Sequence, residues 1–358
     1  MDTIVHYLVE DIKVNQDFKY RQIVGIRSYR SIVVGEFPRR SSERDYPYEY
    51  MYRGDIKDWG AFFEKHNVKA IHCHFGYDAN KMLPIAMRWN IPLIVSFRGN
   101  DASSRKRDNK KVYRKLAKYG SLFLPVCKFF KKELVKLGFP KQKIRVLYGG
   151  IDTDKFSFRG MKTTKDGNYR ILMVGRLAGK KGLPVLLQAF KIVRSKLPKA
   201  KLVIVGKGEP REKKELRRDI RSNRLEAAVE LKDAMPNADI VKEMHRSDLF
   251  CLPSHTTRNG AIEGIPNVLK EAMACGVPVV STFHAGIPEL IAHEKEGALV
   301  KEKDAKALAE AIIRLLRDPD RAAAYAIRAR RKVVRSFHLP TQIKVQEQYY
   351  DELLRKRS

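Results

Sequence analysis

Apolar and polar positions along the chain follow two periods, one typical of buried strands and one typical of amphipathic helices. In the first half, residues 4–9 and 31–35 form short β-branched runs, and residues 17–28 between them carry the helical period. In the second half, residues 169–177 read as a strand and residues 304–316 as an amphipathic helix. Strands that alternate with helices in this way predict parallel βαβ units, and therefore an α/β fold.

The stretch 253–282 is the most informative part of the chain because both ends of a helix are marked in it. Pro266 suits the first helical position, where its missing N–H is no loss, and Gly276 supplies a stop. The pattern predicts a helix over residues 266–275, and the β-branched run 277–280 predicts a buried strand directly after it.

The start of this predicted helix suits a phosphate group. A helix N-terminus offers free N–H groups and a partial positive charge. Because Pro266 has no N–H, the donors would be the amides of Asn267 and Val268, together with that of Gly264.

Two carboxylates frame these amides, and with them the stretch resembles a known motif. Glu263 and Glu271 have seven residues between them within EGIPNVLKEAMACGVPVV, which resembles the Glu-x7-Glu motif of the retaining family 4 glycosyltransferases of the GT-B fold. Two bare glutamates would read equally well as a loop charge and a solvated helix charge; the glycine and proline context makes the match specific. The resemblance implies that Glu271 holds the ribose of a nucleotide sugar and that Glu263 positions the transferred sugar.

Two further stretches of the second half carry the same resemblance. Arg176 and Lys181 resemble the family's GR…KG signature, in which the two cations grip the donor diphosphate. As the sugar leaves, negative charge grows on the β-phosphate, and fixed cations stabilise it. Gly175, and Gly206 at the end of the predicted strand 201–209, would let the backbone approach the nucleotide closely.

In the first half, two strand ends supply the candidates for the sugar and acceptor side. The string IPLIVSFRGND resembles the family's S-F-H-G-x-D, with Arg98 where relatives usually carry histidine. Arg98 and Asp101 would meet the transferred sugar, although arginine can donate a hydrogen bond but cannot act as a base. In VKAIHCH, His74 is an acceptor-side candidate. His72 shares its face of the strand, but no third ligand is apparent, so the sequence predicts no metal site.

The charge balance points to an anionic partner. Lys and Arg outnumber Asp and Glu by 72 to 41, a net charge of +31, which predicts attraction to a polyanion or an anionic surface. Basic side chains gather in residues 105–118 and, interleaved with apolar ones, in residues 128–136. This pattern suits an anionic membrane surface, and the alternative is a solvated basic helix face packed on a core. Nucleic acid ranks lower because no recognised nucleic-acid motif accompanies the charge.

Cysteine usage and hydropathy favour a cytoplasmic location. The four cysteines are far apart in apolar surroundings and read as buried thiols in a reducing compartment. No signal peptide opens the chain, and no apolar run approaches the roughly 18 to 20 residues that span a bilayer. Peripheral association with the inner face of a membrane is compatible with both observations.

The resemblance covers nearly the whole chain and implies its organisation. It implies two Rossmann-like, doubly wound parallel-sheet domains that face each other across a cleft. The expected boundaries are 1–156 for the acceptor-side domain, 157–168 for a linker, 169–335 for the nucleotide-sugar domain, and 336–358 for a helix that crosses back to the first domain.

The predicted function is transfer of a hexose from a nucleotide diphosphate sugar to a hydroxyl of a glycan, polysaccharide or lipid-linked sugar. The resemblance implies retention of the anomeric configuration, with no metal and no other cofactor. Two alternatives stay open: an epimerase or hydrolase of the same fold, and a basic membrane- or nucleic-acid-binding protein with a degenerate site. Intact Glu263, Glu271, Arg176 and Lys181 argue against the second alternative.

Overall fold

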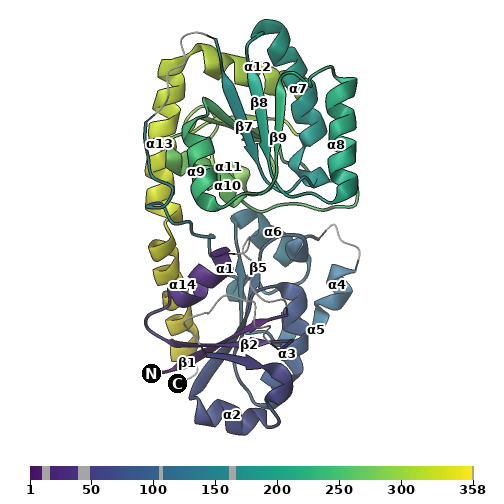
Figure 1. The fold of residues 1–358 in the computed structure, drawn as a ribbon. Helices are drawn as coiled ribbons and strands as arrows, with labels where there is room; N and C mark the ends of the chain where they lie inside the picture. The colour runs from purple at the N-terminus through teal and green to yellow at the C-terminus, as the bar shows by residue number, and fades with distance from the viewer. Residues whose placement is uncertain (10–16, 39–48, 105–107, 161–166, 357–358) are drawn as a thin grey trace. The chain divides into compact units, whose positions relative to one another are not determined.

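The computed structural model of the protein describes residues 1–9, 17–38, 49–104, 108–160 and 167–356. The chain divides into two compact units (Figure 1). The first unit comprises Met1–Gly150 with Leu339–Ser358, and the second comprises Ile151–His338. Each unit contains one six-stranded sheet with helices around it, and the predicted α/β class is confirmed.

The first unit is a parallel sheet in the order β3-β2-β1-β4-β5-β6. Its strands are β1 (Thr3–Leu8), β2 (Arg30–Gly35), β3 (Glu49–Tyr52), β4 (Val68–Cys73), β5 (Leu93–Phe97) and β6 (Leu122–Pro125). Its α-helices are α1 (Asp17–Val24), α2 (Trp59–Lys65), α3 (Gly76–Arg88), α4 (Asn109–Val112), α5 (Arg114–Tyr119), α6 (Lys128–Lys136) and α14 (Leu339–Arg355). The strand order reverses between β1 and β4, which is where ligands bind in doubly wound sheets.

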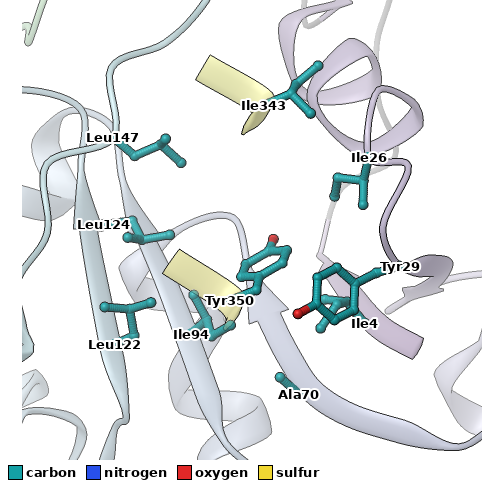
Figure 2. Close-up of a cluster of buried hydrophobic side chains, with 10 residues drawn as sticks. All are labelled: Ile4, Ile26, Tyr29, Ala70, Ile94, Leu122, Leu124, Leu147, Ile343 and Tyr350. Carbon is teal, nitrogen blue, oxygen red and sulfur yellow. The ribbon is translucent and has the colours of Figure 1, made fainter. Parts of the chain in front are cut away.

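Helix α14 belongs to the core of the first unit although it comes last in the sequence (Figure 2). Its residues Ile343 and Tyr350 join a buried cluster that includes Ile4, Ala70 and Ile94 of three neighbouring strands. Burial of such apolar surface is the main stabilising contribution to a core, at about 25 cal/mol per Å². The C-terminal residues are therefore part of the first unit's fold.

The second unit repeats the architecture in the order β12-β11-β10-β7-β8-β9, again with parallel pairing. Its strands are β7 (Arg170–Val174), β8 (Lys201–Val205), β9 (Val229–Lys232), β10 (Leu249–Leu252), β11 (Val279–Thr282) and β12 (Ala298–Val300). Its α-helices are α7 (Leu183–Lys196), α8 (Pro210–Ser222), α9 (Asn237–His245), α10 (Asn267–Cys275), α11 (Ile287–Leu290), α12 (Ala305–Arg317) and α13 (Pro319–Phe337).

The predicted loop, helix and strand around Pro266 are present, with two shifts in their bounds. Helix α10 begins at Asn267, because Pro266 keeps an extended ψ of 126° and acts as the N-cap. Gly276 ends the helix with a left-handed φ of 82°, as predicted. The strand starts two residues late because Val277 N donates to Ala272 O (3.0 Å), a bond that ties Val277 to the end of the helix.

The boundaries of the units also differ from the predicted ones. Residues 151–156 lie in the second unit, because Arg330 of α13 donates to the carbonyls of Thr153 (3.0 Å) and Phe156 (2.9 Å). Residues 161–166 of the predicted linker lie outside the described residues, as do residues 105–107 of the first basic segment. Helix α1 ends at Val24, four residues before the predicted end.

Candidate active site

In the second unit, polar side chains meet at the carboxyl ends of four neighbouring strands. Lys181 follows β7, Glu263 follows β10, His284 follows β11 and Glu302 follows β12. Parallel strands end at the same edge of a sheet, and this edge is the usual ligand-binding edge of doubly wound folds. Most of the residues predicted to bind the donor lie here.

Two lysines form ion pairs with one carboxylate. Lys181 Nζ lies 2.9 Å from Glu263 Oε2, and Lys180 Nζ lies 3.4 Å from Glu263 Oε1. The lysines lie in a 3-10 turn that ends at Gly182, where φ is 71°. A Cβ at Gly182 would also meet the carbonyl oxygen of Pro253 at 2.0 Å. Glycine is required for this turn, and the turn directs both lysines toward Glu263.

The electrostatics keep Glu263 ionised and leave positive charge in excess. Burial opposes ionisation of Glu263, but the ammonium groups of Lys181 and Lys180 outweigh it and lower the pKa of this carboxyl. Burial lowers the pKa of Lys180; Glu263 opposes this shift, and the charges of Lys181 and Arg176 add to it. Two ammonium groups therefore flank one carboxylate, with the charge of Arg176 acting on Lys180, and this excess of positive charge suits a ligand that brings further negative charge.

The two predicted glycines approach each other closely beside Lys181. A Cβ on Gly206 would lie 1.8 Å from the carbonyl oxygen of Gly175, and a Cβ on Gly175 would lie 3.3 Å from Lys181 Cε. Arg176, the next residue, is exposed, and its charge acts on Lys180. The loops after β7 and β8 therefore have room for their backbones only because these positions lack side chains.

The start of α10 belongs to the same loop as Glu263. Gly264 follows Glu263 directly, and its carbonyl accepts a hydrogen bond from Gly286 N (3.2 Å). Asn267 and Val268 are the first two residues of the helix, whose first N–H groups have no partner within the helix. The Asn267 side-chain oxygen accepts from Lys270 Nζ (3.0 Å).

Glu271 differs from Glu263 in its surroundings. Burial raises the pKa of Glu271 to about 7, and the charges of Lys270, Lys155 and Lys181 offset this shift only in part. Among the described residues its carboxylate has no hydrogen bond or ion pair. A carboxylate that is half-buried and without partners can accept from ligand hydroxyls.

In the first unit, Asp101 is bound to the backbone of its own loop. Its buried carboxylate accepts hydrogen bonds from Gly99 N (2.7 Å), Arg98 N (3.1 Å) and Gly76 N (3.1 Å). Burial raises the pKa of Asp101 against the effect of these amides and of the Arg98 charge. These contacts show Asp101 as the residue that shapes the loop after β5 around Arg98.

Arg98 starts a directed hydrogen-bond chain through two histidines. Its Nη2 lies 3.2 Å from His74 Nδ1, and since a guanidinium only donates, His74 Nδ1 accepts. His74 Nε2 then carries the hydrogen and donates to His6 Nδ1 (3.1 Å), so that His6 Nε2 donates to Ser31 Oγ (3.4 Å). Each imidazole is therefore neutral in one tautomer, and burial lowers the pKa of His6 to about 3.

A second chain runs from Arg98 to α14. Arg98 Nη2 donates to Gln22 Oε1 (2.6 Å), and Gln22 Nε2 donates to Gln346 Oε1. Gln346 Nε2 donates to the Tyr350 hydroxyl (2.7 Å), which lies 2.6 Å from His72 Nδ1. Arg98 is thus joined to the C-terminal helix by side chains whose proximity no local sequence pattern predicts.

The histidine cluster contains the third potential metal ligand that the sequence did not reveal. His6 on β1 lies beside His72 on β4 in the sheet register, and the ligand atoms of His6, His72 and His74 lie within 4.8 Å of one another. The expectation that no third ligand exists is wrong. A metal would have to displace the hydrogen bonds described above and sit near the positive charge of Arg98, so the cluster is better suited to hydrogen bonding than to a cation.

The predicted residues thus form two groups, one in each unit. The second unit brings together Gly175, Arg176, Lys181, Gly206, Glu263, Gly264, Asn267, Val268 and Glu271. The first unit holds His74, Arg98 and Asp101 in one hydrogen-bonded set. The sequence missed His284 and Glu302 of the second unit because nothing in their local pattern marks them; only the strand order places them beside Glu263.

Comparison with known families identifies the class of protein. The family model for glycosyl transferases group 1 matches residues 154–332, and the model for glycosyltransferase family 4 matches residues 18–155. The chain therefore belongs to the glycosyltransferases that these two models, group 1 and family 4, describe. Together the two matches cover almost the whole chain.

Curated relatives and solved structures agree with this assignment. The amylovoran biosynthesis glycosyltransferase AmsK of Erwinia amylovora is 36% identical over 270 residues, which are 74% of this chain and 65% of the relative. The putative colanic acid biosynthesis glycosyltransferase WcaL of Escherichia coli K12 is 39% identical over 245 residues, 68% of this chain and 60% of the relative. This chain thus spans less than two thirds of the length of these relatives.

The fold is shared with solved glycosyltransferase structures. Anabaena Alr3699/HepE in complex with UDP superposes with a TM-score of 0.81 at 19% identity, over 98% of this chain and 100% of that one. Sucrose-phosphate synthase of Thermosynechococcus elongatus superposes with a TM-score of 0.79 at 18% identity, over 99% of this chain and 100% of that one. These likenesses establish the two-domain GT-B fold.

In the part of the chain that the structure describes, helices long and apolar enough to cross a bilayer are absent.

Proposed function

We propose that the protein transfers a hexosyl group from a nucleotide diphosphate sugar to an acceptor hydroxyl, with retention of configuration. The observation that carries this proposal is the ion pair of Lys181 with Glu263 beside the start of α10, in a member of a glycosyltransferase family. In the reaction the bond from the anomeric carbon to the β-phosphate breaks and a bond to the acceptor oxygen forms. The acceptor proton leaves to the departing diphosphate or to water.

The second unit would bind the donor. Arg176, Lys180 and Lys181 supply positive charge for the diphosphate, and the Asn267 and Val268 amides supply hydrogen-bond donors. These groups stabilise the negative charge that grows on the leaving group, so the transfer requires no metal ion. Activity in the presence of a chelator tests that part of the proposal.

The two glutamates would have separate tasks. Glu263 is held ionised between two lysines and would accept from hydroxyls of the transferred sugar. Glu271, whose carboxylate is free of partners among the described residues, would accept from the ribose hydroxyls. In the first unit, Arg98 would serve the acceptor side, while His74, which is fully buried and hydrogen-bonded through both ring nitrogens, would hold Arg98 in place. Asp101 would shape their loop.

The donor and the acceptor class follow from the relatives by analogy. HepE was solved with UDP, and AmsK and WcaL are named for biosynthesis of the polysaccharides amylovoran and colanic acid. A UDP-sugar and an acceptor in polysaccharide assembly, in a free or lipid-linked form, are therefore the first combination to test.

Association with an anionic membrane surface would be electrostatic. Of the four apolar side chains that interleave with the lysines of α6, Phe130 and Leu134 are fully buried in the core, Phe129 is half-buried and Val135 is exposed. Lys128 and Lys132 are exposed on the same helix, and charged side chains near an anionic surface contribute about 1 kcal/mol each. Retention on anionic vesicles that disappears at high salt would support this association, and no retention at physiological salt would contradict it.

The experiment that tests the function is an assay with UDP-, GDP- and ADP-sugars, with and without a polysaccharide-derived acceptor. Transfer predicts a nucleoside diphosphate product that depends on the acceptor and a new glycosidic bond. Rapid release of free sugar without acceptor would instead indicate a hydrolase, and an epimeric sugar would indicate an epimerase.

A further inference from the structure

His284 connects the backbone of Glu263 to the side chain of Glu302. Glu263 N lies 3.2 Å from His284 Nε2, and His284 Nδ1 lies 2.7 Å from Glu302 Oε1. The other oxygen of Glu302 accepts from Thr256 N (3.0 Å). His284 is fully buried, so its ring acts within the protein.

The direction of these bonds is fixed. A backbone N–H only donates, so Nε2 of His284 is the acceptor, and the ring hydrogen is on Nδ1. That hydrogen is donated to Glu302. The Glu302 carboxylate therefore favours the tautomer in which Nε2 is free to accept from Glu263 N. Burial opposes ionisation of Glu302, but the bonds from His284 and Thr256 lower the pKa of its carboxyl.

The contacts follow the order of the strands. Glu302 comes after β12, His284 after β11, Glu263 after β10 and Lys181 after β7, and these strands are neighbours in that order. The loop after β11 holds Glu263 and its neighbour at two points, because Gly286 N also donates to the carbonyl of Gly264 (3.2 Å). The backbone of Glu263 is thus fixed by the loop after β11, and its carboxylate is held by the lysines of the loop after β7.

We propose that His284, oriented by Glu302, is a positioning residue for sugar transfer. It holds the loop of residues 254–264, here called the Glu263 loop, in the conformation that the reaction requires. This inference rests on the proposed function, because Glu263 is there assigned to the transferred sugar. Reacting groups have to be held within about 0.5 Å of the productive geometry, and buried hydrogen bonds to the backbone achieve this. Without the His284 ring, the Glu263 N–H would lose its acceptor and the loop would lose this attachment.

Two substitutions at His284 separate the hydrogen bond from packing. His284→Phe keeps the ring volume and removes the acceptor. His284→Gln places an amide oxygen near the position of Nε2, where it can accept from Glu263 N. His293→Phe is the matched control, because His293 Nδ1 also accepts a backbone N–H, from Leu299 (3.0 Å), outside the Glu263 loop.

The first readout is independent of activity. In hydrogen-deuterium exchange, His284→Phe is expected to speed exchange of residues 254–264 by roughly tenfold, while His284→Gln and His293→Phe stay near wild type. In ¹⁵N NMR of the wild type, the His284 ring should show hydrogen on Nδ1, and Glu302→Ala should shift that signal. Unchanged exchange in His284→Phe would overturn the inference.

The second readout is the transfer rate. His284→Phe is expected to lower kcat by about 10- to 100-fold with a small change in donor KM, and His284→Gln to recover most of it. Wild-type kcat in His284→Phe would contradict the proposal. If the wild-type protein transfers no sugar, the proposed function fails, while the exchange measurement still decides whether His284 holds the loop.

Discussion

Lys181 Nζ lies 2.9 Å from Glu263 Oε2, although 81 positions separate the two residues along the chain. The contact arises because β7 and β10 are adjacent, so the loops that follow them meet at one edge of the sheet. Both partners are almost buried, with side-chain exposures of 9% and 14%. Since a lone buried charge is costly, the ammonium groups of Lys181 and Lys180 are what lower the pKa of the Glu263 carboxyl against the effect of burial.

Replacement of Gly206 tests the close approach of the loops after β7 and β8. Gly206→Ala would place a methyl group 1.8 Å from the carbonyl oxygen of Gly175, so the two loops must separate. We expect a loss of about 2–3 kcal/mol of unfolding free energy, seen as a lower Tm, together with weaker nucleotide binding.

Gly179→Ala is the control for this substitution. It adds the same methyl group to the neighbouring turn, where the nearest heavy atom is Thr257 Cγ2 at 4.0 Å. The unfolding free energy should change by no more than about 0.5 kcal/mol, the range of a neutral surface substitution, so the Tm should stay close to that of the wild type. Equal destabilisation by the two substitutions would show that the close approach is not what matters.

The pKa of Glu271, about 7, predicts that donor binding depends on pH. Below pH 7 the carboxyl is protonated and loses its capacity to accept from two ribose hydroxyls, so the affinity for a nucleotide sugar should fall by up to about tenfold from pH 8 to pH 6. The diphosphate of a nucleotide sugar takes up no proton in this range because both phosphates are esterified. Calorimetric titration at several pH values measures the effect, and Glu271→Gln should remove it.

The same residue predicts a slope in stability. Because burial raises the pKa of Glu271 from 4.5 to about 7, the folded state holds a proton that the unfolded state has released between these values. Raising the pH through this window therefore destabilises the fold, and the effect is complete above pH 7. Denaturant unfolding of Glu271→Gln should show a flatter pH dependence than wild type; a parallel curve would count against the assigned shift.

Asp101 is predicted to be a structural carboxylate of the loop that carries Arg98. Asp101→Asn replaces an acceptor of three backbone N–H groups by an amide that can accept with only one oxygen. The expected loss is about 2–3 kcal/mol of unfolding free energy, measured by denaturant unfolding. Asp58→Asn is the control: Asp58 caps α2, and asparagine caps a helix nearly as well as aspartate.

Tyr350 is predicted to link α14 to the histidine cluster through its hydroxyl. Tyr350→Phe leaves His72 Nδ1 and Gln346 Nε2 without a partner at the centre of the first unit, and should lower the unfolding free energy by about 1–3 kcal/mol. The neighbouring Tyr349→Phe removes only a bond to the carbonyl of Val146 (3.1 Å) and should cost less. A larger Tm change for Tyr349→Phe would contradict the description of the network.

The sequence predicted the α/β class and the helix that ends at Gly276, because both depend on local periodicity and on glycine and proline chemistry. It placed Glu263, Arg176 and Lys181 in one site only through a family resemblance, since their proximity depends on the strand order. The same limit explains what it missed. His6 and His72 become neighbours through sheet register, and Gln346 reaches Gln22 only because α14 packs on the first unit.

Local pattern also leaves open the contacts of side chains whose partners are distant. Arg98 and Asp101 follow a strand in the manner of ligand-binding residues, and their observed contacts are with His74, Gln22 and the backbone of their own loop. The apolar residues of α6 fitted a membrane surface as well as a core, and the structure buries Phe130 and Leu134. Hydrophobic periodicity identifies an apolar face but does not say what covers it.

The cations of the second unit should bind a nucleoside diphosphate, and isothermal titration calorimetry with UDP, GDP and ADP measures this binding. We predict that at least one of them binds the wild-type protein and that Lys181→Ala and Arg176→Ala each weaken binding by about tenfold or more. The Lys201→Ala variant lacks an exposed lysine at the first position of β8, at the end of the strand away from the cations, and should bind as the wild type does. Undiminished affinity in Lys181→Ala and Arg176→Ala would show that these cations do not bind the diphosphate.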